Sequence, residues 1–431
     1  MKKAILSILF FMLTQYAHSQ SGPLLEKYRA MALEYNHDLK AAEKNISMSM
    51  ELEKSAMADL KPKLQTGINF QYTGNPAELA LNIPSTGKPV KFKGSDMQYG
   101  ASLSLLQPLY SGRKILESIR LAQLQQSLAS SQAKIVRSAV CYQTDVQYWN
   151  TVARQEIIQI SEDFYNSMQN LTTTIWERVN AGLVDPQDLL MAEVKLNEAR
   201  FQLLQAQNNY ETGRMAFNSL IGSDLQNPTE IERTIPVIVV SDTLLTLNGS
   251  NRPEIHIAQD QIRIAESNLK LKDSRYKPQV YVGIDGSYSA PGYNFRQDMD
   301  LNYSVYARIS APIFEWGKRR SEKRASTEQI GIAVDYLNKT TDNIALEVHT
   351  AKVALQQAME QITLSESSLG KARENEKKAM ERYHEGKISV LKVIDAQTYR
   401  QNSQFNYIQA KIAAQYSYSD LLKALNSYDI Q

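Results

Sequence analysis

An internal repeat constrains the fold of this chain more than any other feature of its sequence. Raising residue numbers in the first half by 216 places Lys61 on Lys277, and a later spacing of 204 places Gly182 on Gly386. The spacing changes because one loop is 12 residues longer in the first copy. We therefore expect two copies of one structural unit, with a first repeat over 20–222, a linker over 223–244, a second repeat over 245–426 and a tail over 427–431.

The first 19 residues have the features of a secretory signal peptide. Lys2 and Lys3 precede an apolar run over 4–13, and Ala17 and Ser19 occupy the small-residue positions of a cleavage site. This run is shorter than the ~20 residues of a membrane-spanning helix, which disfavours a retained anchor helix. No later stretch reaches that length, so we expect an exported chain whose membrane insertion, if any, uses strands.

Composition narrows the class of protein further. The 48 Lys and Arg residues are nearly balanced by 46 Asp and Glu residues, which argues against nucleic-acid binding. The single cysteine, Cys141, permits no internal disulfide and no cysteine-rich metal site. The sequence contains no phosphate-binding loop, zinc-binding histidine pair or nucleophile elbow. We therefore expect no enzyme activity, no cofactor and no metal.

Two segments in each repeat alternate apolar and polar side chains with a period of two, as strands with two different faces do. Each segment is about 9–11 residues long with aromatic residues toward one end, which is typical of a tilted outer-membrane strand. A soluble sheet with one wet face is the alternative interpretation. The residues that we expect to face lipid are Ile68, Phe70, Leu103, Leu105, Val282, Ile284, Val305 and Ile309.

The resulting strands are too few to close a barrel within one chain. An open strand edge would leave backbone N–H and C=O groups without partners in the hydrocarbon core of a bilayer. Single-chain barrels begin at about eight strands. The chain must therefore assemble with copies of itself, and with four strands per chain a dimer would supply eight strands and a trimer twelve.

Long helices account for much of the remaining chain. Residues 113–180 and 318–384 contain no proline, so each is expected to form one helix of about 68 residues, ~100 Å long. Such helices need neighbours along their whole length. In the next helix, small residues at 192, 199, 206 and 213 recur every seven positions, which allows close coiled-coil packing. We interpret this stripe as the wall of a hollow tube, with a plain soluble coiled coil as the alternative.

A glycine and a helix-capping residue mark the turn after each long helix. Gly182 is followed by Asp185, which can cap the next helix, and by Pro186 at the first helical position. Gly386 and Ser389 take the corresponding places in the second copy. The spacing predicts two turns of similar build.

The segments "QPLYSGRK", "APIFEWGKRR", "AGLVDPQDLLMAE" and "EGKISVLKVIDAQ", together with the repeat, resemble the TolC family of bacterial outer-membrane efflux proteins. The resemblance covers nearly the whole chain after the signal peptide. It implies a mainly α fold with membrane β-structure, in which a trimer forms a 12-stranded outer-membrane β-barrel and a long α-helical barrel in the periplasm. The implied function is the outer-membrane channel of a tripartite efflux or type I secretion system, which conducts substrates passively to the exterior. A periplasmic coiled-coil scaffold or adaptor protein is the alternative.

The resemblance also implies partners. They are two further copies of the chain, a periplasmic adaptor protein, an inner-membrane pump of the resistance-nodulation-division or ABC type, and outer-membrane lipid. Nucleic acid is not among them. The residues that match the family's adaptor-docking turns are Gly182, Leu183, Val184, Gly386, Lys387 and Ile388.

A periplasmic gate is implied as well. Tyr383 and Asp188 match a tyrosine and an aspartate whose hydrogen bond helps to hold the family's tip closed, whereas a gate arginine falls on Ile388. The family's paired acidic ring falls on Lys392 and Asp395, so one acid is replaced by a base. If both face the lumen, the cation preference of an acidic ring is weakened. Otherwise the two side chains, three residues apart on a helix, can pair with each other.

Overall fold

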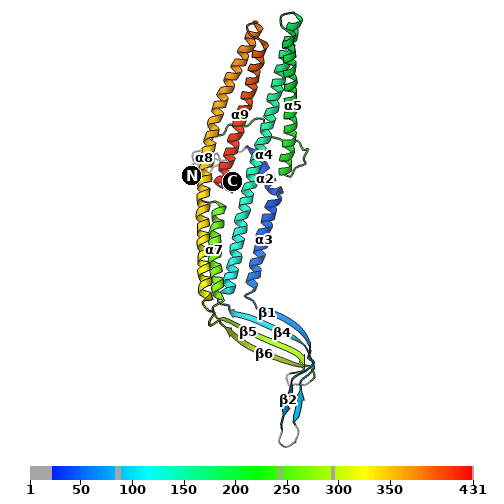
Figure 1. The fold of residues 1–431 in the computed structure, drawn as a ribbon, viewed down its shortest axis with the longest axis vertical. Helices are drawn as coiled ribbons and strands as arrows, with labels where there is room; N and C mark the ends of the chain where they lie inside the picture. The colour runs from blue at the N-terminus through cyan, green and yellow to red at the C-terminus, as the bar shows by residue number, and fades with distance from the viewer. Residues whose placement is uncertain (1–21, 83–88, 241–243, 245, 293–296, 430–431) are drawn as a thin grey trace, which may run out of the picture. The chain divides into compact units, whose positions relative to one another are not determined.

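The computed structural model describes residues 22–82, 89–240, 244, 246–292 and 297–429 (Figure 1). The predicted signal peptide over 1–19 lies outside the described residues. The chain divides into two compact units. The helical unit comprises the residues up to 43 with 131–256 and 339–431, and the sheet unit comprises 44–130 and 257–338.

Two very long helices confirm the sequence-based expectation almost to the residue. Helices α4 (Lys114–Asn180) and α8 (Lys318–His384) each contain 67 residues without a break. Each is followed by a shorter helix, α5 (Pro186–Leu220) after α4 and α9 (Val390–Ala424) after α8. Figure 1 shows α5 running beside α4 and α9 beside α8.

The helices that open the two repeats differ from each other. In the first copy, α2 (Pro23–Tyr35) and α3 (His37–Ala58) are separated at Asn36, whose side-chain oxygen accepts a 2.8 Å hydrogen bond from the Leu39 N–H. In the second copy, α7 (Pro253–Ser274) is a single helix. A short 3-10 helix, η1 (Ser427–Asp429), follows α9.

Four antiparallel strands form the main sheet in the order β1 (Lys63–Tyr72), β4 (Met97–Tyr110), β5 (Gln279–Ala290) and β6 (Asp300–Ser310). Their register aligns rows of like side chains across the sheet. One row consists of Leu64, Leu105, Ile284 and Val305, and the next row consists of Gln65, Ser104, Asp285 and Ser304. Because successive side chains point to opposite faces, one face of the sheet is apolar and the other is polar.

A second, smaller sheet was not expected from the sequence. Strands β2 (Glu78–Leu81) and β3 (Val90–Lys93) pair with each other in the loop that is longer in the first copy. Each has only four residues, which is too short for an alternating pattern to stand out. The first repeat therefore carries four strands rather than two.

The predicted stripe of small residues is buried in the helical unit. Ala192, Ala199 and Ala206 are at most 5% exposed. An added Cβ at Gly213 would come within 2.7 Å of the Arg154 guanidinium, so a larger residue there would displace this side chain of α4. No helix in the described ranges has an apolar stretch of the length that crossing a membrane requires.

Candidate functional site

The two turns between the paired helices have the same backbone construction. Gly182 and Gly386 adopt left-handed φ values of +70° and +71°, which side chains other than glycine rarely adopt. The N–H of the residue after each glycine donates a 2.9 Å hydrogen bond to a carbonyl five residues earlier, on Arg178 and Arg382. This satisfies carbonyls that a helix end otherwise leaves free.

The caps of the following helices differ. The Asp185 side chain accepts a 2.8 Å hydrogen bond from the Gln187 N–H, as expected for the start of α5. Ser389 stands at the same place before α9, but its side chain makes no capping bond, so the expectation of equivalent caps was wrong. Apolar packing secures this second turn instead, because Val390 is buried and Ile388 packs against the same core cluster.

The six predicted docking residues fall into two groups. Leu183 is 69% exposed, and Lys387 is exposed and pairs with Glu385 at 2.7 Å. A Cβ added at either turn glycine would have no other atom within 4 Å, so both glycines face open space. By contrast, Val184 and Ile388 are half-buried against the core cluster around Tyr383. The turns therefore present an exposed surface held from behind by two apolar side chains.

The predicted hydrogen bond between Tyr383 and Asp188 is not present. Tyr383 is 3% exposed, and its hydroxyl has no hydrogen-bond partner among the described residues. Arg178 of α4 makes the contact instead, because its Nη1 donates a 2.9 Å hydrogen bond to the Tyr383 carbonyl and its guanidinium carbon lies 4.8 Å from the ring centre. Burial raises the pKa of the Tyr383 hydroxyl, the nearby Asp188 carboxylate adds to this, and Arg178 opposes it.

The structure places Lys392 and Asp395 in the first turns of α9. Lys392 is exposed and Asp395 is half-buried. Across the described ranges, no ion pair joins these two side chains. The interpretation that they neutralise each other on the helix surface therefore receives no support from the geometry.

A buried ionic cluster in the helical unit was not predicted. Arg29 of α2 makes two hydrogen bonds to the Asp145 carboxylate of α4, at 2.6 and 2.7 Å. Tyr428 of η1 donates its hydroxyl to the same carboxylate at 2.6 Å, and Ser419 of α9 donates at 3.3 Å. The cluster ties three helices and the chain's C-terminal turn together. No sequence signal links residues this far apart.

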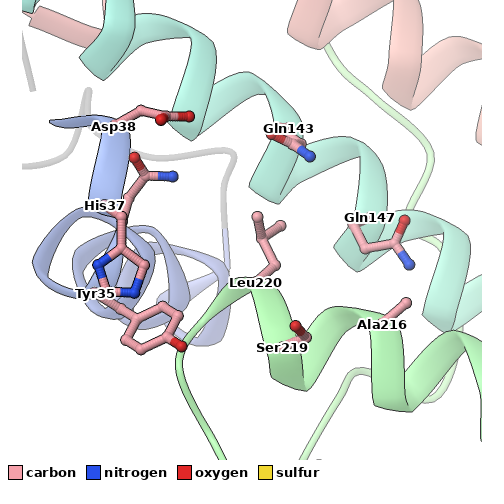
Figure 2. Close-up of a pocket in the computed structure, with 9 residues that line it drawn as sticks. Tyr35, His37, Asp38, Gln143, Gln147, Ala216, Ser219 and Leu220 are labelled. Atoms are coloured by element: carbon pink, nitrogen blue, oxygen red, sulfur yellow. The ribbon is translucent and has the colours of Figure 1, made fainter. Parts of the chain in front are cut away.

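A groove of about 410 Å³ lies where α2 and α3 separate (Figure 2). His37, Gln143, Gln147 and Ser219 line it together with Tyr35, so its lining is mostly polar. Figure 2 shows these side chains coming from the α2–α3 break, α4 and α5. In the described part of the chain, no three His, Cys, Asp or Glu residues converge as they would around a metal ion.

All eight residues expected to face lipid lie on the apolar face of the main sheet. Ile68, Val305 and Ile309 are 89%, 70% and 73% exposed in the single chain. Leu105 and Val282 are half-buried. So large an exposed apolar surface requires a non-aqueous neighbour.

A four-stranded sheet with one apolar face, joined to very long paired helices, is the architecture of an outer-membrane channel subunit with helical and β-barrel parts. The chain belongs to the outer membrane efflux protein family, whose sequence pattern matches residues 29–223 and 244–427. The predicted outer-membrane location and efflux-channel function are thereby confirmed, in preference to a periplasmic scaffold or adaptor.

Individual relatives agree with this assignment. The solvent efflux pump outer membrane protein SrpC of Pseudomonas putida is 24% identical over 420 residues, which cover 94% of this chain and 85% of that protein. The Campylobacter jejuni CmeC outer membrane channel superposes with a TM-score of 0.75 at 20% identity, covering 94% of this chain and 86% of CmeC. The Vibrio cholerae outer membrane protein VceC superposes with a TM-score of 0.77 at 16% identity, covering 93% and 96%. The predicted TolC-like fold is confirmed.

Proposed function

We propose that three copies of the chain close into one outer-membrane channel that serves a tripartite efflux pump. The register of the main sheet carries this proposal. Its apolar rows suit lipid, and its polar rows suit a water-filled interior. In the described chain, β1 and β6 each leave one edge unpaired. The two edge strands run in opposite directions, so the β6 edge of one copy can pair antiparallel with the β1 edge of the next.

The interior space favours three copies over two. An eight-stranded barrel is just wide enough for its own side chains to fill it. The polar face here carries bulky residues such as Gln65 and Tyr306, which would obstruct a barrel of that size. Twelve strands leave room for a conduit. Channel recordings of the purified chain in planar bilayers test for this conduit. Absence of any conductance would contradict the proposed channel.

The exposed turns are the proposed docking surface for a periplasmic adaptor. Leu183 and Lys387 supply an apolar and a cationic contact on rigid, glycine-defined turns. A photo-crosslinking residue at Leu183 in intact cells should yield an adduct with a periplasmic adaptor protein. The same residue at Leu204 of α5, which is 57% exposed, is the control and should not yield that adduct. Equal adducts at both positions would argue against docking at the turns.

The gate is proposed to lie at the start of α9. We place Lys392 and Asp395 on the lumen, where three copies would alternate three bases with three acids near the constriction. Lys392→Asp should make the ring wholly acidic and increase the cation preference measured from reversal potentials in a salt gradient. Lys371→Asp on α8 is the charge-matched control. An unchanged reversal potential in Lys392→Asp would place this position outside the conduction path.

A further inference from the structure

Every junction between a strand of the main sheet and a helix carries exposed cations. All four junctions lie at the same end of the sheet, because the strands alternate in direction. We call six of these residues the basic collar: Lys61, Arg113, Lys114, Arg275, Lys318 and Arg320. All six are exposed. Both repeats contribute to the collar, so three copies would surround the channel with eighteen cations.

Two acids at these junctions, Asp59 and Asp273, are already engaged by cations outside the collar. Lys63 pairs with Asp59 at 2.8 Å. Lys277 and Arg319 both pair with Asp273, at 3.3 and 2.8 Å. Within the described ranges, no ion pair engages any collar residue. Stabilisation of the fold therefore accounts for the neighbouring cations but not for the collar.

Exposed aromatic side chains accompany the collar between β6 and α8. Trp316 is 91% exposed and Phe314 is 70% exposed, with their ring centres 4.9 Å apart in an edge-to-face arrangement. They lie in the segment that joins the end of β6 at Ser310 to the start of α8 at Lys318, at the end of the sheet where the collar lies. Trp316 and Arg113 also adopt left-handed φ values of +45° and +76°, which are costly for residues with a Cβ. Strain of this kind clusters at functional positions.

We propose that the basic collar binds the anionic headgroups of phospholipids in the inner leaflet of the outer membrane. Tryptophan favours the interface between hydrocarbon and headgroups, and cations just beyond it attract anionic lipid. Each such cation enriches an anionic headgroup by about fivefold at low salt. An acidic protein partner would complement the charge but not the exposed Trp316 beside a lipid-facing sheet. The proposal rests on the sheet lying in a bilayer, as the proposed channel requires.

Tryptophan fluorescence provides a local probe of this lipid contact. The chain has three tryptophans, and Trp149 and Trp176 lie in the helical unit, outside the sheet unit that carries Trp316. The full chain is reconstituted into vesicles of phosphatidylcholine with phosphatidylglycerol. Only one of the two lipids carries brominated acyl chains in each sample, and a Trp316→Phe sample gives the background. We expect brominated phosphatidylglycerol to quench Trp316 with a relative binding constant several-fold above that of brominated phosphatidylcholine.

Salt and a matched pair of variants test the role of charge. The preference should approach one in 0.5 M salt, where the Debye length falls to about 4 Å. The double variant Lys318→Gln/Arg320→Gln should lower the preference for phosphatidylglycerol by roughly fivefold or more at low salt. Lys371→Gln/Lys377→Gln, also on α8 but in the helical unit, should leave it unchanged.

The possible results separate the inference from the proposed function. Equal quenching by both lipids in the unaltered chain, or a preference that survives high salt, would overturn lipid recognition by the collar. Absence of quenching by either lipid would instead contradict the position of the sheet in the bilayer. The salt series uses the unaltered chain, so it remains decisive even if a variant fails to assemble.

Discussion

Arg178 of α4 holds the end of α8 through Tyr383, to whose carbonyl it donates a 2.9 Å hydrogen bond while stacking on the ring. A hydrogen bond from a charged donor contributes about 1.5–3 kcal/mol, and a cation–π contact adds about 0.5–1 kcal/mol. This contact occupies the place where the family resemblance implied a tyrosine–aspartate bond. We therefore predict that the contact between the two helix pairs depends on the arginine.

The first prediction concerns this contact. Arg178→Ala should increase the leak conductance of the closed channel in planar bilayers, because α8 loses its attachment to α4. Tyr383→Phe should change conductance little, since the hydroxyl that it removes has no hydrogen-bond partner among the described residues. The opposite result, a leak in Tyr383→Phe with none in Arg178→Ala, would restore the tyrosine hydroxyl as the latch.

The second prediction concerns the buried pair of Arg29 and Asp145. Asp145→Ala should lower the free energy of unfolding by about 3–5 kcal/mol, because it removes both hydrogen bonds from Arg29 to this carboxylate while the arginine charge stays buried. Arg29→Met/Asp145→Leu should cost less than Asp145→Ala alone, since no uncompensated charge remains. Denaturant unfolding followed by circular dichroism measures both. Arg29→Met and Asp145→Leu are also measured singly, and a double-variant loss equal to the sum of these two losses would show that the pair is not coupled.

The third prediction is a loss of stability at alkaline pH. Burial, with the Asp145 charge beside it, raises the pKa of Tyr428 well above its usual value of 10. Above about pH 10 this tyrosine ionises in the unfolded chain but stays protonated in the folded one, so unfolding becomes easier as pH rises. The contribution of Tyr428 is fully present below pH 10 and falls by about 1.4 kcal/mol per pH unit above it. Melting curves of the unaltered chain and of Tyr428→Phe between pH 8 and 11 measure this loss. The same fall of stability with pH in both proteins would contradict a contribution from Tyr428.

The fourth prediction concerns the width of the β-structure. The Tyr306 ring lies across Gly283 on the neighbouring strand, where an added Cβ would come within 2.5 Å of the hydroxyl oxygen. Both residues lie on the polar face, so Gly283→Ala should push the ring into the channel and reduce single-channel conductance. Gly283→Ala/Tyr306→Ala should recover it. Gly286→Ala is the control, because its nearest neighbour would be 3.9 Å away.

The features that could be predicted from the sequence are those set by local patterns, namely the extents of the long helices and the faces of the strands. The absence of proline over 113–180 and 318–384 located α4 and α8 within one residue, since a helix depends on neighbours in sequence. The alternation in β1 assigned Ile68 and Phe70 to the apolar face correctly, because a strand's period fixes its faces.

Contacts between segments that are distant in the chain could not be predicted from the sequence. Arg29 and Asp145 lie 116 residues apart, and nothing in either local pattern indicates that packing brings them together. For the same reason, the family correspondence of Tyr383 and Asp188 did not predict the contacts that Tyr383 makes. Arg178 replaced the expected hydrogen bond, and only the packing of α4 against α8 reveals this.

Closure by three copies is the central claim, and covalent linking of the strand edges tests it most directly. In a Cys141→Ser background, Asn69 of β1 is changed to cysteine together with one position at a time along β6, so that oxidation joins each chain to its neighbours. At the correct register, a ring of three copies yields covalent species that end at the trimer on denaturing gels. A ladder that ends at two, or continues beyond three, would contradict the account.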